Sequence, residues 1–307
     1  MIRPILITQC LLLLLTTTGY SAEPIAELGP VGKVKKLHTD LQFTEGPTKA
    51  PDGTIYFTDI PADRIYELAT DGTLSVFLEP AGHCNGLMVT ADGKLYACSM
   101  DGQLITIDRK TKKVTPLASE YEGKRFNAPN DLVVDKSGGI YFTDPHFRAP
   151  EPLPQGTTAV YYRAANGKVT RLLDDLKAPN GVILSPDEKT LYVIPSMQSE
   201  MMAYPVESPG KLGQGKLFCT LKQKDGQSGS GGDGLTVDTQ GNLYITTGLG
   251  LQVYDPEGQL LGIIELPEQP ANVTFGGKKN NILYVTARKS LYTVKMKATG
   301  HQFSGKQ

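Results

Sequence analysis

The sequence of 307 residues contains no tryptophan and only four histidines and four cysteines. The cysteines lack the paired CxxC spacing of a structural zinc site. Neither sign of charge is in excess, because 31 Lys and Arg residues face 32 Asp and Glu residues at a formal net charge of -1. The chain therefore offers no electrostatic basis for binding nucleic acid. The missing tryptophan also gives no support for a protein interface.

Long apolar runs are missing beyond the N-terminus. The chain begins with Arg3, an apolar run from Ile5 to Leu15 and small or polar residues up to Ala22, which is typical of a secretory signal peptide. That run is short for a membrane span, and no later run reaches about 18 apolar residues. We predict a signal peptide over residues 1–22 and an exported chain, periplasmic or secreted, that has no membrane contact after cleavage. A retained N-terminal anchor is the alternative.

Three cysteines would remain after cleavage: Cys84, Cys98 and Cys219. This odd number permits at most one intramolecular disulfide in an oxidising compartment. The spacing leaves their redox state open, and we expect them to pack as small buried hydrophobic residues.

A hairpin-like segment recurs along the chain, whereas helical periodicity is absent over any useful length. Each copy has a short apolar strand, a turn rich in Asp, Gly or Asn, and a second strand that contains a tyrosine. The copies are EGPTKAPDGTIYFTD from Glu45, NGLMVTADGKLYACS from Asn85, NDLVVDKSGGIYFTD from Asn130, NGVILSPDEKTLYVIP from Asn180, DGLTVDTQGNLYITT from Asp233 and NVTFGGKKNNILYVT from Asn272. Their tyrosines recur about every 40 to 50 residues, which is the length of one propeller blade.

Further strands follow each hairpin, so the repeat predicts an all-β, six-bladed β-propeller with four-stranded antiparallel blades. The last repeat ends one strand short, while VGKVKKLHT at residues 31–39 precedes the first repeat without a partner. We predict that this N-terminal strand closes the last blade, which would remove the open sheet edges of the ring. Residues 23–307 would then form a single domain.

The first strand of each blade lines the central channel of a propeller, so the leading residues of the repeats should form a ring. These six ring positions are Glu45, Asn85, Asn130, Asn180, Asp233 and Asn272. Two unpaired carboxylates in a channel would be costly through desolvation and mutual repulsion, and a divalent cation would remove that cost. Oxygen donors favour Ca²⁺, with Mg²⁺, Mn²⁺ or Zn²⁺ as other possibilities. Alternatively, these residues only cap strand starts.

With these motifs in view, the chain resembles the senescence-marker-protein/gluconolactonase (regucalcin-like) family of six-bladed propellers. The resemblance covers about residues 41–297 and rests on four motifs. They are EGP at Glu45, RFNAPNDLVVD around Asn130, PNGVILSPD around Asn180 and DGLTVD at Asp233. The resemblance implies a divalent metal held by Glu45, Asn180 and Asp233, with Asn130 as a further ligand.

The resemblance also implies residues that contact substrate. The substrate-binding arginine of the family corresponds to Arg125, while Asn130 and Asn85 are further candidate substrate contacts. Either Asn127 or Asn130 could take the family's asparagine position, and the downstream NDLVVD favours Asn130.

The implied activity is metal-dependent hydrolysis of a lactone, first of all a sugar lactone such as gluconolactone. Asp233 is the candidate catalytic residue, either positioning or deprotonating water, attacking directly, or serving only as a ligand. His83 and His146 are weaker candidates for proton transfer, and Asp59 and Asp144 either orient the ligands or cap turns.

Two other functions fit the same pattern. One is a propeller without catalytic activity that binds a ligand or protein around a structural metal, and the other is a phosphotriesterase-like hydrolase. The loops at residues 145–158 and 196–202 would set substrate specificity. The sequence predicts neither the substrate ring nor the oligomeric state.

Overall fold

The computed structural model describes residues 24–303, and all regular elements of this part of the chain are β-strands. The predicted signal peptide, residues 1–22, lies outside the described residues, so export stays a prediction. None of the described residues belongs to a helix long and apolar enough to cross a membrane.

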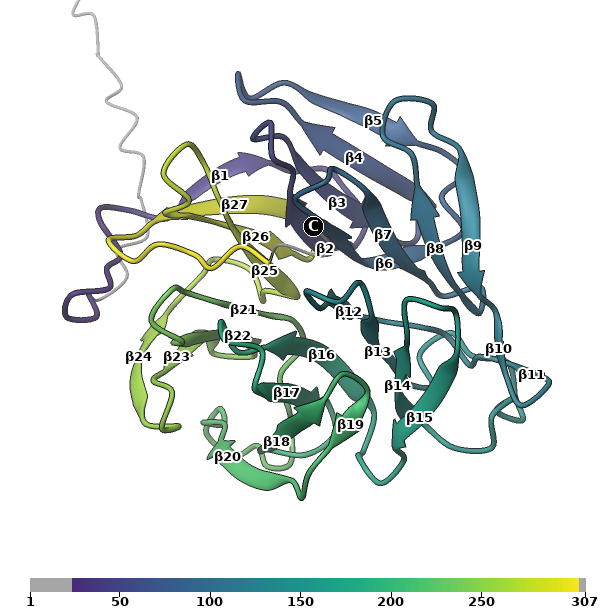
Figure 1. Cartoon of the computed structure of the whole chain (residues 1–307). Coiled ribbons are helices and arrows are strands. Elements are labelled where there is room, and N and C mark those ends of the chain that lie inside the picture. Colours follow the sequence, from purple (N-terminus) through teal and green to yellow (C-terminus); the bar gives the residue numbers. More distant parts are fainter. Residues whose placement is uncertain (1–23, 304–307) are drawn as a thin grey trace, which may run out of the picture.

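The strands form six antiparallel sheets that are arranged around an axis as the blades of a propeller (Figure 1). The first three blades are β2 (Thr44–Lys49), β3 (Ile55–Asp59), β4 (Arg64–Leu68) and β5 (Leu74–Leu78); β6 (Cys84–Val89), β7 (Leu95–Ser99), β8 (Gln103–Ile107) and β9 (Val114–Ala118); and β12 (Leu132–Val134), β13 (Ile140–Asp144), β14 (Ala159–Arg163) and β15 (Val169–Leu173). The fourth and fifth are β16 (Pro179–Leu184), β17 (Thr190–Pro195), β18 (Glu200–Ser208) and β20 (Lys216–Thr220); and β21 (Leu235–Val237), β22 (Leu243–Thr247), β23 (Gly250–Tyr254) and β24 (Leu260–Ile264).

The sixth blade combines the first strand of the described chain with the last three. It is formed by β25 (Asn272–Gly276), β26 (Ile282–Ala287), β27 (Ser290–Lys295) and the N-terminal strand β1 (Lys35–His38), which pairs with β27. The predicted closure of the last blade by the N-terminal strand is therefore confirmed.

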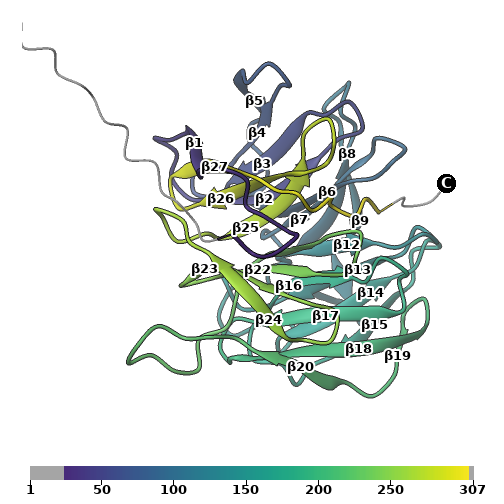
Figure 2. The same ribbon diagram turned by 90° about the vertical axis from the view of Figure 1, so that its left-hand side faces the viewer.

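Two short hairpins extend this plan. Strands β10 (Glu120–Tyr121) and β11 (Lys124–Arg125) pair between the second and third blades. Strand β19 (Lys211–Leu212) pairs with the far end of β18, which is longer than its neighbours. In Figure 2, β16, β17 and β18 of the fourth blade lie side by side.

Burial decreases from the axis of the propeller to its rim. All residues of β3, β13 and β22, the second strands of their blades, are buried, whereas the outer strands β5, β9 and β15 are largely exposed or half-buried. Four of the aligned tyrosines are buried, and Tyr244 packs edge-on against Phe275 of the next blade, with ring centroids 5.1 Å apart. The tyrosine repeat thus reflects packing within and between blades.

Neighbouring inner strands approach so closely at the axis that the residue after a ring position has little room for a side chain. A Cβ on Gly86 would lie 2.7 Å from the carbonyl oxygen of Asn130, and one on Gly181 would lie 2.5 Å from that of Asp233. The amides of these glycines donate hydrogen bonds to the same two carbonyls, at 2.7 and 2.9 Å. Glycine is required here because the backbones of adjacent blades touch.

Threonines of the second strands hold the next blade in the same way. The hydroxyl of Thr58 donates to the carbonyl of Asn85 at 3.1 Å, and that of Thr143 donates to the carbonyl of Asn180 at 2.7 Å. Both acceptors are ring positions, so these hydrogen bonds fix where the ring side chains begin.

Replacing Gly181 with alanine should destabilise the protein, because the new methyl group would meet backbone rather than a flexible side chain. We expect Gly181→Ala to lower the free energy of unfolding by about 1–3 kcal/mol. Gly213→Ala is the matched control, since its Cβ would meet only side-chain atoms, the nearest at 3.3 Å. Urea denaturation of both variants measures the difference, and equal stabilities would contradict the close approach at the hub.

Candidate functional site

A pocket of about 460 Å³ opens where the inner strands begin. Its floor contains five of the six ring positions: Glu45, Asn85, Asn130, Asn180 and Asp233. Glu45, Asn85 and Asn180 lie on the inner strands β2, β6 and β16, while Asn130 and Asp233 lie two residues before the starts of β12 and β21. The structure thus brings together oxygen donors from five blades that are far apart in sequence.

Burial dominates the electrostatics of this floor. The pKa of the Glu45 carboxyl is raised well above its ordinary value, first by burial and then by the nearby charge of Asp233. Burial also raises the pKa of Asp233, although the Asn180 side chain hydrogen bonds to its carboxylate and opposes the shift. Two carboxylates that repel each other in a buried site favour protons or a cation.

The side chain of Asn180 is oriented by its neighbours. Its Nδ2 donates to Oγ of Ser196 at 2.9 Å, and the Ser196 hydroxyl donates to the carbonyl of Gly232 at 3.0 Å. Because a serine hydroxyl has one proton and gives it to Gly232, it can only accept from Asn180, which fixes the amide orientation. The arrangement leaves Oδ1 of Asn180 as a candidate ligand atom.

Asp59 holds the chain that leads into Glu45. Its two carboxylate oxygens accept hydrogen bonds from the backbone amides of Gln42 and Phe43, at 3.0 and 2.9 Å. These amides lie three and two residues before Glu45, so Asp59 acts on the path of the backbone and not on the ligand side chain.

Asp144 does the same in the third blade, where it accepts from the backbone amides of Asn127 and Ala128, both at 2.8 Å. The side chain of Asn127 is itself bonded to the backbone, donating to the carbonyl of Thr157 at 2.8 Å. Asn127 is therefore a structural residue, and Asn130 is the asparagine that lines the pocket.

Arg125, predicted to bind substrate, does not line this pocket. Its side chain lies against Gly102 and reaches the carbonyl of Asn127 at 3.4 Å. The cation that does line the pocket is Arg148, which sequence reasoning missed. Arg148 belongs to the predicted specificity loop at residues 145–158, but its left-handed backbone, with φ of 61°, gave no signal in the sequence.

The two histidines considered for proton transfer do not line the pocket either. Nδ1 of His83 lies 3.1 Å from a carboxylate oxygen of Asp101, and the ring of His146 packs beside that of Phe147. Both histidine side chains are half-buried.

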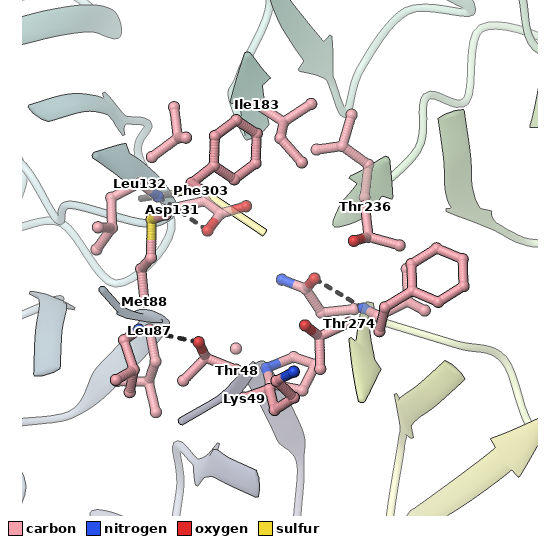
Figure 3. Close-up of a pocket in the computed structure, with 18 of the residues that line it drawn as sticks. Thr48, Lys49, Leu87, Met88, Asp131, Leu132, Ile183, Thr236, Thr274 and Phe303 are labelled. Carbon is pink, nitrogen blue, oxygen red and sulfur yellow. Dashed lines mark hydrogen bonds between the residues drawn. The ribbon is translucent and has the colours of Figure 1, made fainter. Parts of the chain in front are cut away.

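A second, smaller cavity has a volume of about 100 Å³. Figure 3 shows residues that line it. The cavity is lined by residues that follow the ring positions, including Thr48, Asp131 and Thr236, and by Phe303 from the C-terminal segment. Asn272, expected on the ring, lines this cavity instead, although its side chain still hydrogen bonds to Glu45. Asp131 is a third buried carboxyl group, whose pKa burial raises to about 7.

The cysteines are buried as expected. Cys84, Cys98 and Cys219 are all free thiols. Within residues 24–303, no three His, Cys, Asp or Glu side chains form a metal-binding group, so the donors on the pocket floor are carboxylates combined with amides.

The chain is similar in sequence and fold to known gluconolactonases and to a regucalcin. A gluconolactonase of Zymomonas mobilis is 30% identical over 92% of this chain and 86% of its own length. A solved gluconolactonase from Xanthomonas campestris is 31% identical with a TM-score of 0.78, over 86% of this chain and 89% of that one. A calcium-binding protein, regucalcin, from Agrobacterium tumefaciens is 26% identical with a TM-score of 0.73, over 88% and 96%.

The profile of the SMP-30/Gluconolactonase/LRE-like region matches residues 43–289, which include all six ring positions. Because this match spans most of the described chain, it determines the family. The chain belongs to the SMP-30/gluconolactonase/LRE-like family.

Proposed function

We propose that the protein is a metal-dependent hydrolase that opens lactone rings. The observation that carries the proposal is the pocket floor, where the buried carboxylate of Glu45, the half-buried carboxylate of Asp233 and three amides face a space large enough for a small ligand. Relatives named gluconolactonase support a sugar lactone as the first substrate to test. The protein would then belong to the carboxylic ester hydrolases.

The donor set fits a divalent cation. Glu45, Asn180, Asp233 and Asn130 would hold it, and their oxygens match the preference of Ca²⁺, with Mg²⁺, Mn²⁺ or Zn²⁺ as alternatives. The pKa values of Glu45 and Asp233 are raised because burial outweighs the hydrogen bonds and the charge of Arg288 that favour the ionised forms, and a bound cation would offset this cost. A bound cation would polarise the lactone carbonyl and stabilise the negative charge that develops on its oxygen.

The protein side chains would supply water activation and orientation. Asp233 is partly exposed to the pocket and its raised pKa brings it near the range of a useful general base. It would deprotonate or position the attacking water, with direct attack by the carboxylate as the alternative. Asn85 and Asn130, on the same floor, would hydrogen bond to the substrate.

Two other functions remain in contention. A propeller that only binds a ligand or protein would need the ring as a structural metal site, and a phosphotriesterase-like enzyme would use the same floor on a different ester. The open pocket favours hydrolysis, because a purely structural cation needs no space beside it.

Replacing Asp233 with alanine should reduce kcat/KM for gluconolactone by at least about 100-fold, the contribution typical of a general base. Chelation of the metal should cause a comparable loss that added Ca²⁺ reverses. Asp71→Ala, which alters an exposed turn in the first blade, is the control and should keep full activity. Full activity of Asp233→Ala would exclude this mechanism. Turnover of a phosphotriester but of no lactone would favour the second alternative, and turnover of neither would favour the binding protein.

Stability without metal should depend on pH in an unusual direction. The carboxyl groups of Glu45, Asp131 and Asp233 have higher pKa values in the folded chain than in the unfolded chain, mainly because of burial. At about pH 4 these carboxyl groups are protonated in the folded chain and their burial costs little. As pH rises through about 7, the pKa of Asp131, they must ionise in the folded chain, and the free energy of unfolding decreases.

We therefore expect Tm in chelator to fall between about pH 5 and pH 8, and Ca²⁺ to offset most of this fall by replacing protons at the carboxylates. Thermal unfolding with EDTA and with CaCl₂ over this range makes the comparison. Asp233→Asn should weaken the pH dependence in EDTA, since it removes one of the titrating groups. A flat Tm in EDTA, or no response to Ca²⁺, would count against the proposed metal site.

A further inference from the structure

The walls of the pocket differ sharply between its two sides. Above the floor, the sixth blade and the first three blades contribute mostly apolar side chains, with Arg148 and Gln269 as the polar ones. The apolar ones are Phe43, Ile60, Pro61, Met100, Phe147 and Pro270. The fourth and fifth blades contribute hydroxyl groups and backbone instead: Ser196, Ser230, Gly231, Gly232, Thr246, Thr247 and Gly248. The floor that carries the ring positions lies between these two walls.

The apolar side is a packed structure. Ile60 and Met100 are buried in a small core of their own, together with Ala128, and Phe43 and Phe147 pack against that core. The backbone of Phe43 is also held by Asp59, and the guanidinium of Arg288 lies over the Phe43 ring at 5.7 Å. We call Phe43, Ile60, Met100 and Phe147 the apolar wall.

A polyhydroxylated lactone would use only part of this pocket. The hydroxyls of Ser196, Thr246 and Thr247 already hydrogen bond within the protein. The substrate hydroxyl groups would therefore find polar partners in Ser230, Arg148 and Gln269. A hydroxyl turned toward the apolar wall would lose its hydrogen bonds to water and gain none. The pocket volume of about 460 Å³ falls in the range of about 300–1,000 Å³ that drug-sized ligands occupy. The space beside the apolar wall thus suits a hydrocarbon group.

We infer that the pocket accepts lactones that carry an aryl or branched alkyl substituent, which packs against Phe43, Ile60, Met100 and Phe147 while the lactone group lies over the ring positions. This inference rests on the proposed lactonase function and specifies its substrate class. It extends the range of substrates beyond sugar lactones, because the two sides of the pocket recognise different parts of a substituted ring.

The test compares γ-phenyl-γ-butyrolactone with unsubstituted γ-butyrolactone, each rate being divided by that of hydroxide-catalysed hydrolysis of the same lactone. Burial of the phenyl ring should raise the normalised kcat/KM by about 10-fold or more. The corresponding lactams, 5-phenyl-2-pyrrolidinone and 2-pyrrolidinone, are not hydrolysed readily and can serve as inhibitors. The phenyl lactam should have the lower inhibition constant of the two.

Phe147→Ser should lower the ratio of the normalised kcat/KM for the phenyl lactone to that for the unsubstituted lactone by several-fold. Phe147→Leu should retain most of this ratio, because leucine preserves an apolar surface. Phe218→Ser is the matched control: Phe218 is also half-buried, but it packs between Tyr192 and Tyr254 in the outer part of the fourth and fifth blades. This control should leave the ratio unchanged.

The outcomes separate the two proposals. The inference would be overturned if the protein hydrolysed gluconolactone but gave equal normalised rates for the phenyl and unsubstituted lactones and was inhibited equally by the two lactams. The lactonase function would then still hold. An unchanged ratio in Phe147→Ser would also overturn it. A folded, calcium-loaded protein that hydrolyses none of these lactones would overturn the lactonase function, and the inference with it.

Discussion

The close approach of the inner strands at the axis is the constraint on which the rest of the structure depends. Where Gly86 and Gly181 touch the carbonyls of Asn130 and Asp233, the backbones of consecutive blades are in direct contact. Contact at this range places the preceding side chains within reach of one another across the channel. The donors on the pocket floor are therefore a consequence of how the blades pack, and a wider hub would separate them.

This geometry also concentrates negative charge. Glu45, Asp131 and Asp233 lie along one channel, and each has a raised pKa because desolvation disfavours its charged form. The fold thus maintains at its centre an arrangement that costs free energy when it is ionised and empty. Such strained electrostatics are typical of functional sites, where a ligand makes up for the cost.

The features that repeat in the sequence were the ones that it predicted well. The tyrosine spacing, the blades, the N-terminal closing strand and the convergence of Glu45, Asn180 and Asp233 all follow from one backbone geometry used six times. The pocket walls do not repeat, so they could not be derived in the same way. Arg148 lines the pocket and Arg125 does not, because the position of Arg148 depends on a local left-handed turn that is closed by the hydrogen bond from the Ala149 amide to the His146 carbonyl. The repeat correctly predicted that Asn272 lies in the channel, but Asn272 lines the second cavity and not the pocket that contains the other ring positions.

The closing of the sixth blade has a consequence for how the chain acquires its structure. Thr44 Oγ1 donates to the carbonyl of Ser290 across 246 residues of sequence, and β1 pairs with β27 next to this contact. A ribosome releases the first strand long before its partner exists, so this sheet cannot be completed during synthesis. Contacts between residues so far apart in sequence form slowly. The five blades made of consecutive strands can assemble locally, whereas the joint between the two chain ends must wait for the finished polypeptide.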